Sequence, residues 1–216
     1  MEKYRIGIIR VLTTSDSKIL EAHGVLLEKY FPRFNTVSRC IPDQLMGVHN
    51  AETEALAIPK VITLGRKMAG EFDAIIVSCA GDPGVAGLRE YVNIPVIGAG
   101  EATAFLAMKY GNIFGVLGIT DEPPPAYKKY LKNIVGIHRP KTVNNTLDLM
   151  TEEGRKAVFE AAISIRDAGA EVIAMSCTGI GALEICQEIE AHCSIPVIDP
   201  IQAMGIIAYF ECLRRS

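Results

Sequence analysis

The chain has 216 residues, enough for one large domain or for two small ones that each bury a core. Its composition of 49% hydrophobic and 22% charged residues is ordinary for an α/β protein, and a net charge of −3 excludes a basic surface for nucleic acid or for a membrane. No apolar run approaches the ~20 residues that a membrane helix needs, and the first residues do not resemble a signal peptide.

The first half of the chain predicts alternating strands and helices. The first strand, 4–11 (YRIGIIRV), is followed by the polar loop Thr13–Asp16. Helices are predicted at 19–31, 51–69 and 84–91, and further strands at 34–39, 73–78 and 93–98. Pro95, near the start of the last of these strands, favours a position at the edge of the sheet, because proline lacks a backbone donor.

The second half repeats this order. Its predicted strands are 112–119, 134–138, 171–176 and 194–199. Its predicted helices are 101–109, 123–132, 151–168, 180–191 and 201–213, with a polar loop over 141–148. Thr151 is a natural cap for the third of these helices. We expect the last helix to pack back on the first half.

The shared order predicts a duplicated unit and an α/β fold of two similar lobes related by pseudo-two-fold symmetry. Each lobe would hold a short, mostly parallel sheet flanked by helices. The expected boundaries are 1–98 plus 199–216 for the first lobe, with its returning C-terminal helix, and 99–198 for the second lobe.

The most informative repeat is a cysteine at the end of a buried strand. Residues 73–79 (DAIIVSC) are followed by Ala80-Gly81, and 171–177 (EVIAMSC) are followed by Thr178-Gly179. The two cysteines are 98 positions apart (177 minus 79). Because open α/β sheets bind ligands at the carboxyl ends of their strands, we expect Cys79 and Cys177 to face each other across a cleft between the lobes.

Two thiols on opposite sides of one carbon suit the inversion of a stereocentre. One thiolate would remove a proton from one face, and the other thiol would return a proton to the opposite face. Each cysteine precedes a predicted helix start, where free N–H groups and the helix dipole favour the thiolate. The glycines that follow would let the backbone approach the substrate and hold an oxyanion.

Cysteine is also a common core residue, and a duplicated core position carries no chemistry by itself. We interpret Cys40, Cys186, Cys193 and Cys212 as core residues. The six cysteines form no CxxC pair and do not cluster with histidine at zinc spacing, so we expect free thiols in a reducing cytoplasm and neither a metal nor a cofactor. The two thiols could serve a metal, but no third ligand is evident.

Other polar residues are candidates for lesser roles. Small hydroxyls at predicted strand ends, suited to polar edges of a substrate, are Thr13, Thr14, Ser78, Thr120, Ser176 and Thr178. Asp82 is expected to cap the helix that follows it rather than to orient a backbone. Glu101 either enters the cleft or charges the first turn of its helix. The loop residues His49 and His138 are interpreted as surface groups.

With these residues the chain resembles the aspartate/glutamate/hydantoin racemase superfamily. Residues 72–90 (FDAIIVSCAGDPGVAGLRE) and 94–102 (IPVIGAGEA) are most similar to its hydantoin racemase branch. The resemblance covers essentially the whole chain. It implies a two-lobed α/β fold, racemisation without a cofactor, and Cys79 and Cys177 as the acid and base. The implied substrate-binding residues are Ser78, Ala80, Gly81, Thr120, Thr178 and Gly179.

The sequence also departs from the family. The first strand ends in RVLTTSD rather than in an Asn-Pro-Asn type of loop. Amino-acid racemases often carry Asn-Thr after the first cysteine and Thr-His after the second, where this chain has Ala80-Gly81 and Thr178-Gly179. The leading hypothesis is a racemase of 5-substituted hydantoins. The alternatives are an aspartate, glutamate or related amino-acid racemase and a non-catalytic small-molecule-binding member of the fold. We expect a small-molecule substrate, no nucleic acid, no membrane, and association into a homo-oligomer.

Overall fold

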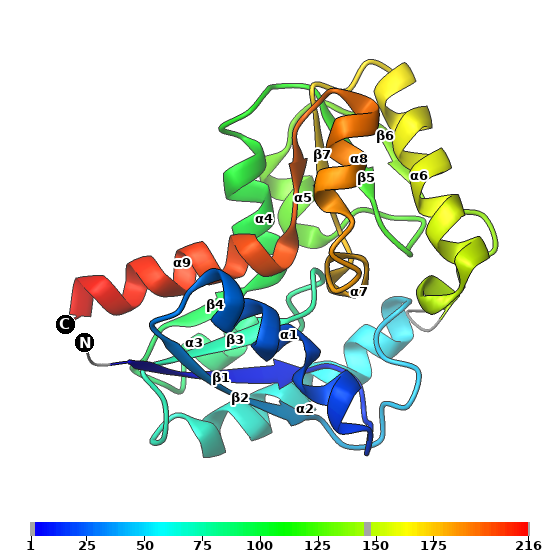
Figure 1. Cartoon of the computed structure of the whole chain (residues 1–216). Coiled ribbons are helices and arrows are strands. Elements are labelled where there is room, and N and C mark those ends of the chain that lie inside the picture. The colour runs from blue at the N-terminus through cyan, green and yellow to red at the C-terminus, as the bar shows by residue number, and fades with distance from the viewer. Residues whose placement is uncertain (1–2, 145–147, 216) are drawn as a thin grey trace.

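The computed structural model describes residues 3–144 and 148–215. They form two lobes, each built on a four-stranded sheet (Figure 1). The first lobe contains β1 (Tyr4–Arg10), α1 (Ser17–Tyr30), β2 (Phe34–Cys40), α2 (Ala51–Met68), β3 (Ala74–Ser78), α3 (Val85–Arg89) and β4 (Val96–Gly98).

The second lobe starts directly after the last strand of the first. Its elements are α4 (Ala99–Ala107), β5 (Phe114–Leu117), α5 (Pro125–Tyr130), β6 (Ile134–His138), the 3₁₀ helix η1 (Asp148–Met150), α6 (Glu152–Asp167), β7 (Val172–Met175), α7 (Thr178–Gly181), α8 (Cys186–Cys193), β8 (Val197–Ile198) and α9 (Pro200–Arg215).

The two sheets have the same strand order. It is β2-β1-β3-β4 in the first lobe and β6-β5-β7-β8 in the second, and every described pairing is parallel. The α/β class and the two similar lobes expected from the sequence are therefore confirmed. The edge position expected from Pro95 is also confirmed, because β4 is an outer strand of its sheet.

Central strands are apolar because both of their faces are covered. In β1, Ile6 and Ile8 pack on one face with α1 and α9, whereas Ile9 packs on the other face with residues of α2. All five residues of β3 and all four residues of β7 are buried. The carboxyl ends of β3 and β7 therefore emerge directly from well-packed cores.

The helices α4 and α9 cross between the lobes. α4 follows β4 of the first lobe but packs against α5 and β7 of the second. α9 follows β8 of the second lobe but packs against α1 and β3 of the first, as the sequence led us to expect. The two helices also contact each other, and Figure 1 shows α9 running from the upper lobe to the first strands of the lower one.

Three predicted elements differ clearly from the structure. The strand expected over 93–98 is shortened to β4. The single helix expected over 180–191 is two helices, α7 and α8, because the connecting Glu184 takes a left-handed conformation with φ of 54°. The strand expected over 194–199 is reduced to β8, because α8 runs to Cys193 and Ser194 caps it with φ of 56°. Within the loop predicted over 141–148, residues 145–147 lie outside the described residues.

No described helix is both long and apolar enough to cross a bilayer.

Candidate active site

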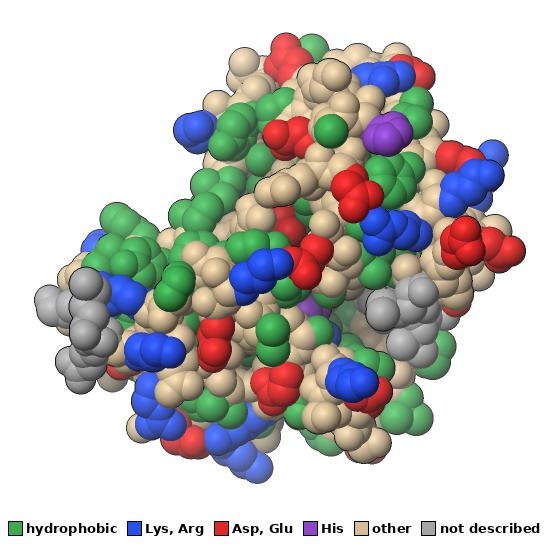
Figure 2. All heavy atoms as spheres, viewed as in Figure 1, with side chains coloured by type: hydrophobic (Ala, Val, Ile, Leu, Met, Phe, Trp, Pro, Cys, Tyr) green, Lys and Arg blue, Asp and Glu red, His purple; other side chains and the backbone are tan. Residues whose placement is uncertain are grey.

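A cavity of about 780 Å³ lies where the strand ends of the two lobes meet, and a hollow between the lobes is visible in Figure 2. All eight residues that the sequence singled out for the site line this cavity, namely Ser78, Cys79, Ala80, Gly81, Thr120, Cys177, Thr178 and Gly179. Thr13, Thr14 and Ser176 line it as well. The structure therefore brings together strand-end residues from both halves of the chain.

The two cysteines occupy related but unequal positions. Cys177 is the N-cap residue of α7, directly before the first helical turn, and is 6% exposed. Cys79 follows β3 and is partly exposed, but the loop 80–84 separates it from α3. The expectation that each thiol immediately precedes a helix is therefore right for Cys177 and wrong for Cys79. No described cysteine forms a disulfide.

Burial dominates the protonation of both thiols. It raises the pKa of Cys79 to about 12, although the N–H of Gly81 favours the thiolate. Burial also raises the pKa of Cys177, against the N–H groups of Ile180 and Gly179. The N–H groups therefore favour the thiolates, as expected, but desolvation of the charged sulfurs outweighs these hydrogen bonds.

The lobes are joined beside the cysteines by a hydrogen bond. The Thr178 hydroxyl donates to the carbonyl oxygen of Ser78 over 3.3 Å. Ser78 precedes Cys79 and Thr178 follows Cys177, so this bond links the two strand ends at the cavity floor. It brings the two cysteine segments into direct contact.

Sequence reasoning missed two buried residues behind Ser78. His23 of α1 lies 2.7 Å from the Ser78 hydroxyl through Nδ1, is 2% exposed, and lines the cavity. Burial and the charge of Arg10 hold the pKa of His23 well below its usual value, so its ring is neutral. Arg10, the last residue of β1, also lines the cavity. The spacing of Arg10 and His23 in the sequence does not predict that they belong to the site, because β1 and α1 come together only in the folded chain.

Glu54 and His49 belong to the cavity wall as well. A Cβ placed at Gly81 would lie 3.7 Å from both Cys79 Sγ and Glu54 Cδ. Burial is the larger cause of the raised pKa of Cys79, and the charge of Glu54 contributes to it. Burial raises the pKa of Glu54. His49, which we interpreted as a surface group, is half-buried on the wall, whereas His138 lies at the end of β6, outside the cavity lining.

Asp82 caps a helix, but not the one expected. Its carboxylate accepts hydrogen bonds from the N–H groups of Gly100 and Glu101, at 2.8 and 2.7 Å. These groups belong to the first turn of α4, rather than to α3, which follows Asp82 in the chain. Burial raises the pKa of Asp82 to about 7. A Cβ at Gly100 would lie 2.0 Å from the carbonyl oxygen of Ala80, so glycine here lets α4 approach the cysteine loop.

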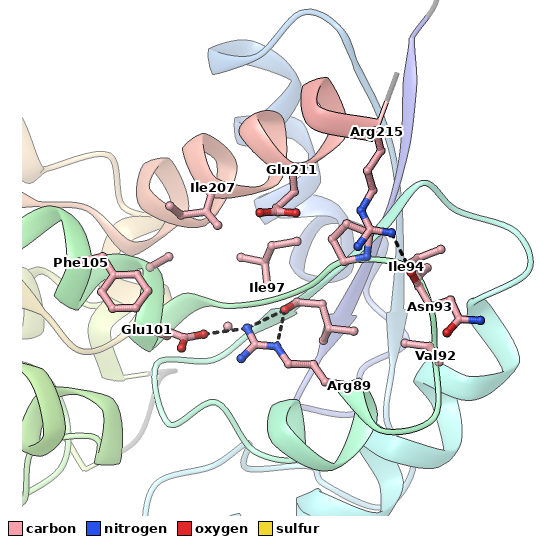
Figure 3. A pocket seen from close by; sticks show the side chains of 14 residues that line it. Arg89, Val92, Asn93, Ile94, Ile97, Glu101, Phe105, Ile207, Glu211 and Arg215 are labelled. Atoms are coloured by element: carbon pink, nitrogen blue, oxygen red, sulfur yellow. Dashed lines mark hydrogen bonds and ion pairs between the residues drawn. The ribbon is translucent and has the colours of Figure 1, made fainter.

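Glu101 lies outside the cleft. It forms an ion pair of 2.7 Å with Arg89 and lines a separate pocket of about 460 Å³ (Figure 3). Of the two roles left open for it, the charge in the first turn of α4 is the one that the structure supports.

The remaining cysteines lie away from the cavity. Three of them, Cys186, Cys193 and Cys212, are buried in the hydrophobic cores, as expected. Cys40 is only partly buried, at the end of β2. Within residues 3–144 and 148–215, no group of three or more His, Cys, Asp or Glu side chains is arranged to hold a metal ion.

Comparison with known proteins identifies one family of racemases by both a family model and individual relatives. Residues 18–204 match the family model described as Asp/Glu/Hydantoin racemase. A hydantoin racemase from Pseudomonas sp. (strain NS671) is 28% identical over 169 residues, which are 69% of this chain and 63% of that protein. The match thus spans less than two thirds of that relative's length.

Solved structures extend the likeness to the fold. An allantoin racemase from Pseudomonas fluorescens superposes with a TM-score of 0.82 and 26% identity, covering 98% of this chain and 91% of its own. A glutamate racemase isoform from Bacillus anthracis superposes with a TM-score of 0.71 and 17% identity, covering 100% and 84%. The second likeness concerns the fold alone.

Proposed function

The chain belongs to the Asp/Glu/hydantoin racemase family, and from that membership we propose that it is a cofactor-independent racemase of 5-substituted hydantoins. The observation that carries the proposal is the lining of one cavity by Cys79 and Cys177, which follow equivalent strands of two similar lobes. The likeness to a hydantoin racemase and an allantoin racemase supports a ring substrate, since allantoin is itself a 5-substituted hydantoin.

In the proposed reaction, the thiolate of one cysteine removes the proton at C5 of the ring. The C–H electron pair moves into the neighbouring carbonyl and forms an enolate. The thiol of the other cysteine then protonates C5 from the opposite face, which inverts the centre. The first cysteine ends as a thiol and the second as a thiolate, so the reverse reaction uses the same two groups with their roles exchanged.

The groups around the two thiols support the proposed roles of the cysteines as base and acid. N–H groups of Gly81, Gly179 and Ile180 bond the sulfurs and would stabilise whichever one is ionised. The ring carbonyls of a hydantoin acidify C5, so a small thiolate fraction suffices. The hydroxyls of Thr14 and Ser176 line the cavity and donate to no described residue, which leaves them for the enolate oxygen.

The decisive experiment follows one hydantoin enantiomer in metal-stripped protein. Optical rotation should decay to zero, and in D₂O deuterium should enter at C5. A panel of alkyl, aryl and ureido hydantoins that shows neither change would contradict the substrate class. Deuterium uptake at the α-carbon of aspartate or glutamate would instead favour an amino-acid racemase. Thermal stabilisation by a ligand that survives Cys79→Ser and Cys177→Ser, without isotope exchange, would indicate a binding protein.

We also propose that two copies of the chain associate. Several apolar side chains are exposed on α4, its C-terminal cap and α9, namely Phe105, Met108, Ile206, Phe210 and Leu213, and hydrophobic side chains gather along α9 in Figure 2. The adjoining pocket carries both Arg89 and Glu211, and charges of opposite sign on one face are compatible with a self-complementary two-fold contact. Light scattering should give twice the chain mass, and Phe210→Asp should yield the monomer.

A further inference from the structure

The cavity contains a buried cation that the proposed reaction does not use. Arg10 ends β1 and is only 4% exposed. It is the register partner of Ser78 on the neighbouring strand, so it lies beside the segment that leads to Cys79. Arg10 is also among the residues that line the cavity.

The hydrogen bonds of Arg10 use only one of its three nitrogens. Nη1 donates to the carbonyl oxygens of Ile19 and Leu20, at 2.6 and 2.7 Å. Within the part of the chain that the structure describes, Nε and Nη2 donate to no protein group, and no carboxylate lies within ion-pair distance. Burial lowers the pKa of Arg10 to about 10, more than Cys40 and the carboxylate of Glu21 raise it, so the guanidinium is charged at neutral pH. A buried charge without an ion-pair contact is costly, and a ligand carboxylate would offset that cost.

The three carboxyl groups on the cavity wall form no ion pair with Arg10 among the described residues. Glu54 lies on this wall, and burial raises its pKa, which favours the neutral acid. Glu122 pairs with Lys128 over 2.7 Å, and Asp121 lies 3.6 Å from Arg139. The neighbouring His23 is neutral and adds no charge. Lys18, at the mouth of the first lobe, has no ion-pair partner among the described residues and adds to the positive potential of this wall.

We propose that Arg10 binds a carboxylate on the C5 substituent of the substrate, so that the preferred hydantoins are those with an acidic side chain. This inference rests on the proposed hydantoin racemase activity and specifies its substrate. The planar guanidinium offers Nε–H and Nη2–H side by side, which matches the two oxygens of a carboxylate.

The test compares two hydantoins of nearly equal size in D₂O. One carries a carboxyethyl group at C5, and the other carries the corresponding carbamoylethyl group. The wild-type protein should exchange the C5 proton of the carboxylate compound with a kcat/KM about 10- to 100-fold higher, as expected for a hydrogen bond between buried charged groups.

Variants assign the preference to Arg10. Arg10→Gln should bring the ratio of the two kcat/KM values close to one, and Arg10→Lys should give an intermediate ratio. Arg39→Gln is the matched control, because Arg39 lies in the same sheet and pairs with Glu71 outside the cavity. It should keep the wild-type ratio. If Arg10→Gln does not fold, Arg10→Lys and the wild-type comparison still decide the question.

The possible outcomes distinguish a failure of this inference from a failure of the proposed hydantoin racemase activity. Equal rates for the two hydantoins in the wild-type protein would overturn the inference and leave the racemase proposal intact. A preference that survives Arg10→Gln would overturn the assignment to Arg10. Exchange of neither hydantoin would overturn the inference, and the panel of alkyl, aryl and ureido hydantoins would then decide the racemase proposal by itself. Exchange of glutamate alone would overturn the inference, because the carboxylate would then be recognised on an amino acid rather than on a ring.

Discussion

Thr178 of the second lobe donates a hydrogen bond to the backbone carbonyl of Ser78 in the first lobe. The bond lies between the residue before one cysteine and the residue after the other. At 3.3 Å, it is a direct side-chain link between the two strand ends that carry the cysteines.

Removal of this hydrogen bond should lower the stability of the protein. Thr178→Val keeps the shape of the side chain but leaves the buried Ser78 carbonyl without this donor. We expect the free energy of unfolding to fall by about 1–2 kcal/mol in urea titrations. Thr120→Val is the control, because the Thr120 hydroxyl bonds only the nearby Glu122 carbonyl in an exposed loop. Equal losses in the two variants would contradict the proposed role of the lobe-to-lobe bond.

Replacement of either cysteine should produce an enzyme that deprotonates only one enantiomer of the hydantoin. In Cys79→Ser and in Cys177→Ser, a serine hydroxyl cannot act as the base, so racemisation should fall at least ~10³-fold. Each variant should still exchange deuterium into the hydantoin enantiomer that its remaining thiol deprotonates. Cys40→Ser, at the end of β2 and outside the cavity, should retain wild-type rates. Loss of exchange from both enantiomers in both variants would argue against two opposed thiols.

The raised thiol pKa values predict a base-limited pH profile. Since the pKa of Cys79 is about 12, the thiolate fraction rises with pH throughout the neutral and mildly alkaline range. We expect kcat/KM for racemisation to increase about tenfold per pH unit from about pH 7 to about pH 10. A profile that is flat across this interval would mean that a thiolate is already present at neutral pH.

Asp82 should make stability depend on pH. Its pKa is 3.8 in the unfolded chain and about 7 in the folded one, so the folded state binds the proton more tightly. This contribution is complete below pH 3.8 and is lost as pH rises through about 7. The difference in Tm between wild type and Asp82→Asn should therefore shift against the wild type from pH 5 to pH 8. A difference that is independent of pH would contradict the raised pKa.

Gly100 tests the contact between α4 and the cysteine loop. A methyl group there would lie 2.0 Å from the Ala80 carbonyl oxygen, so one of the two backbones must move. Gly100→Ala should cost about 1–3 kcal/mol of stability and should lower the racemisation rate, because Ala80 adjoins Cys79. Gly70→Ala is the matched control, since nothing lies within 4 Å of its Cβ position. A Gly100→Ala protein with wild-type stability would show that α4 and the cysteine loop can move apart at this contact without loss of stability.

The repeated elements were the part that sequence could predict. The apolar run before Cys79 and its counterpart before Cys177 fixed β3 and β7, and the matched order of elements predicted two equivalent sheets. What sequence could not predict depends on contacts across the fold. Arg10 and His23 meet at Ser78 only after β1, α1 and β3 assemble. The target of the Asp82 cap is 18 residues away, and the thiol pKa values depend on burial that no local pattern reveals.

The exchange of α4 and α9 has a consequence for the origin of the chain. A half-length precursor with this arrangement would send its terminal helix to cover another copy's sheet, and so would exist as a reciprocally exchanged dimer. Joining two such genes end to end would turn a pair of identical subunits into one polypeptide without changing a single packing contact. The two cysteine-bearing halves could then diverge, one gaining Arg10 while its counterpart did not.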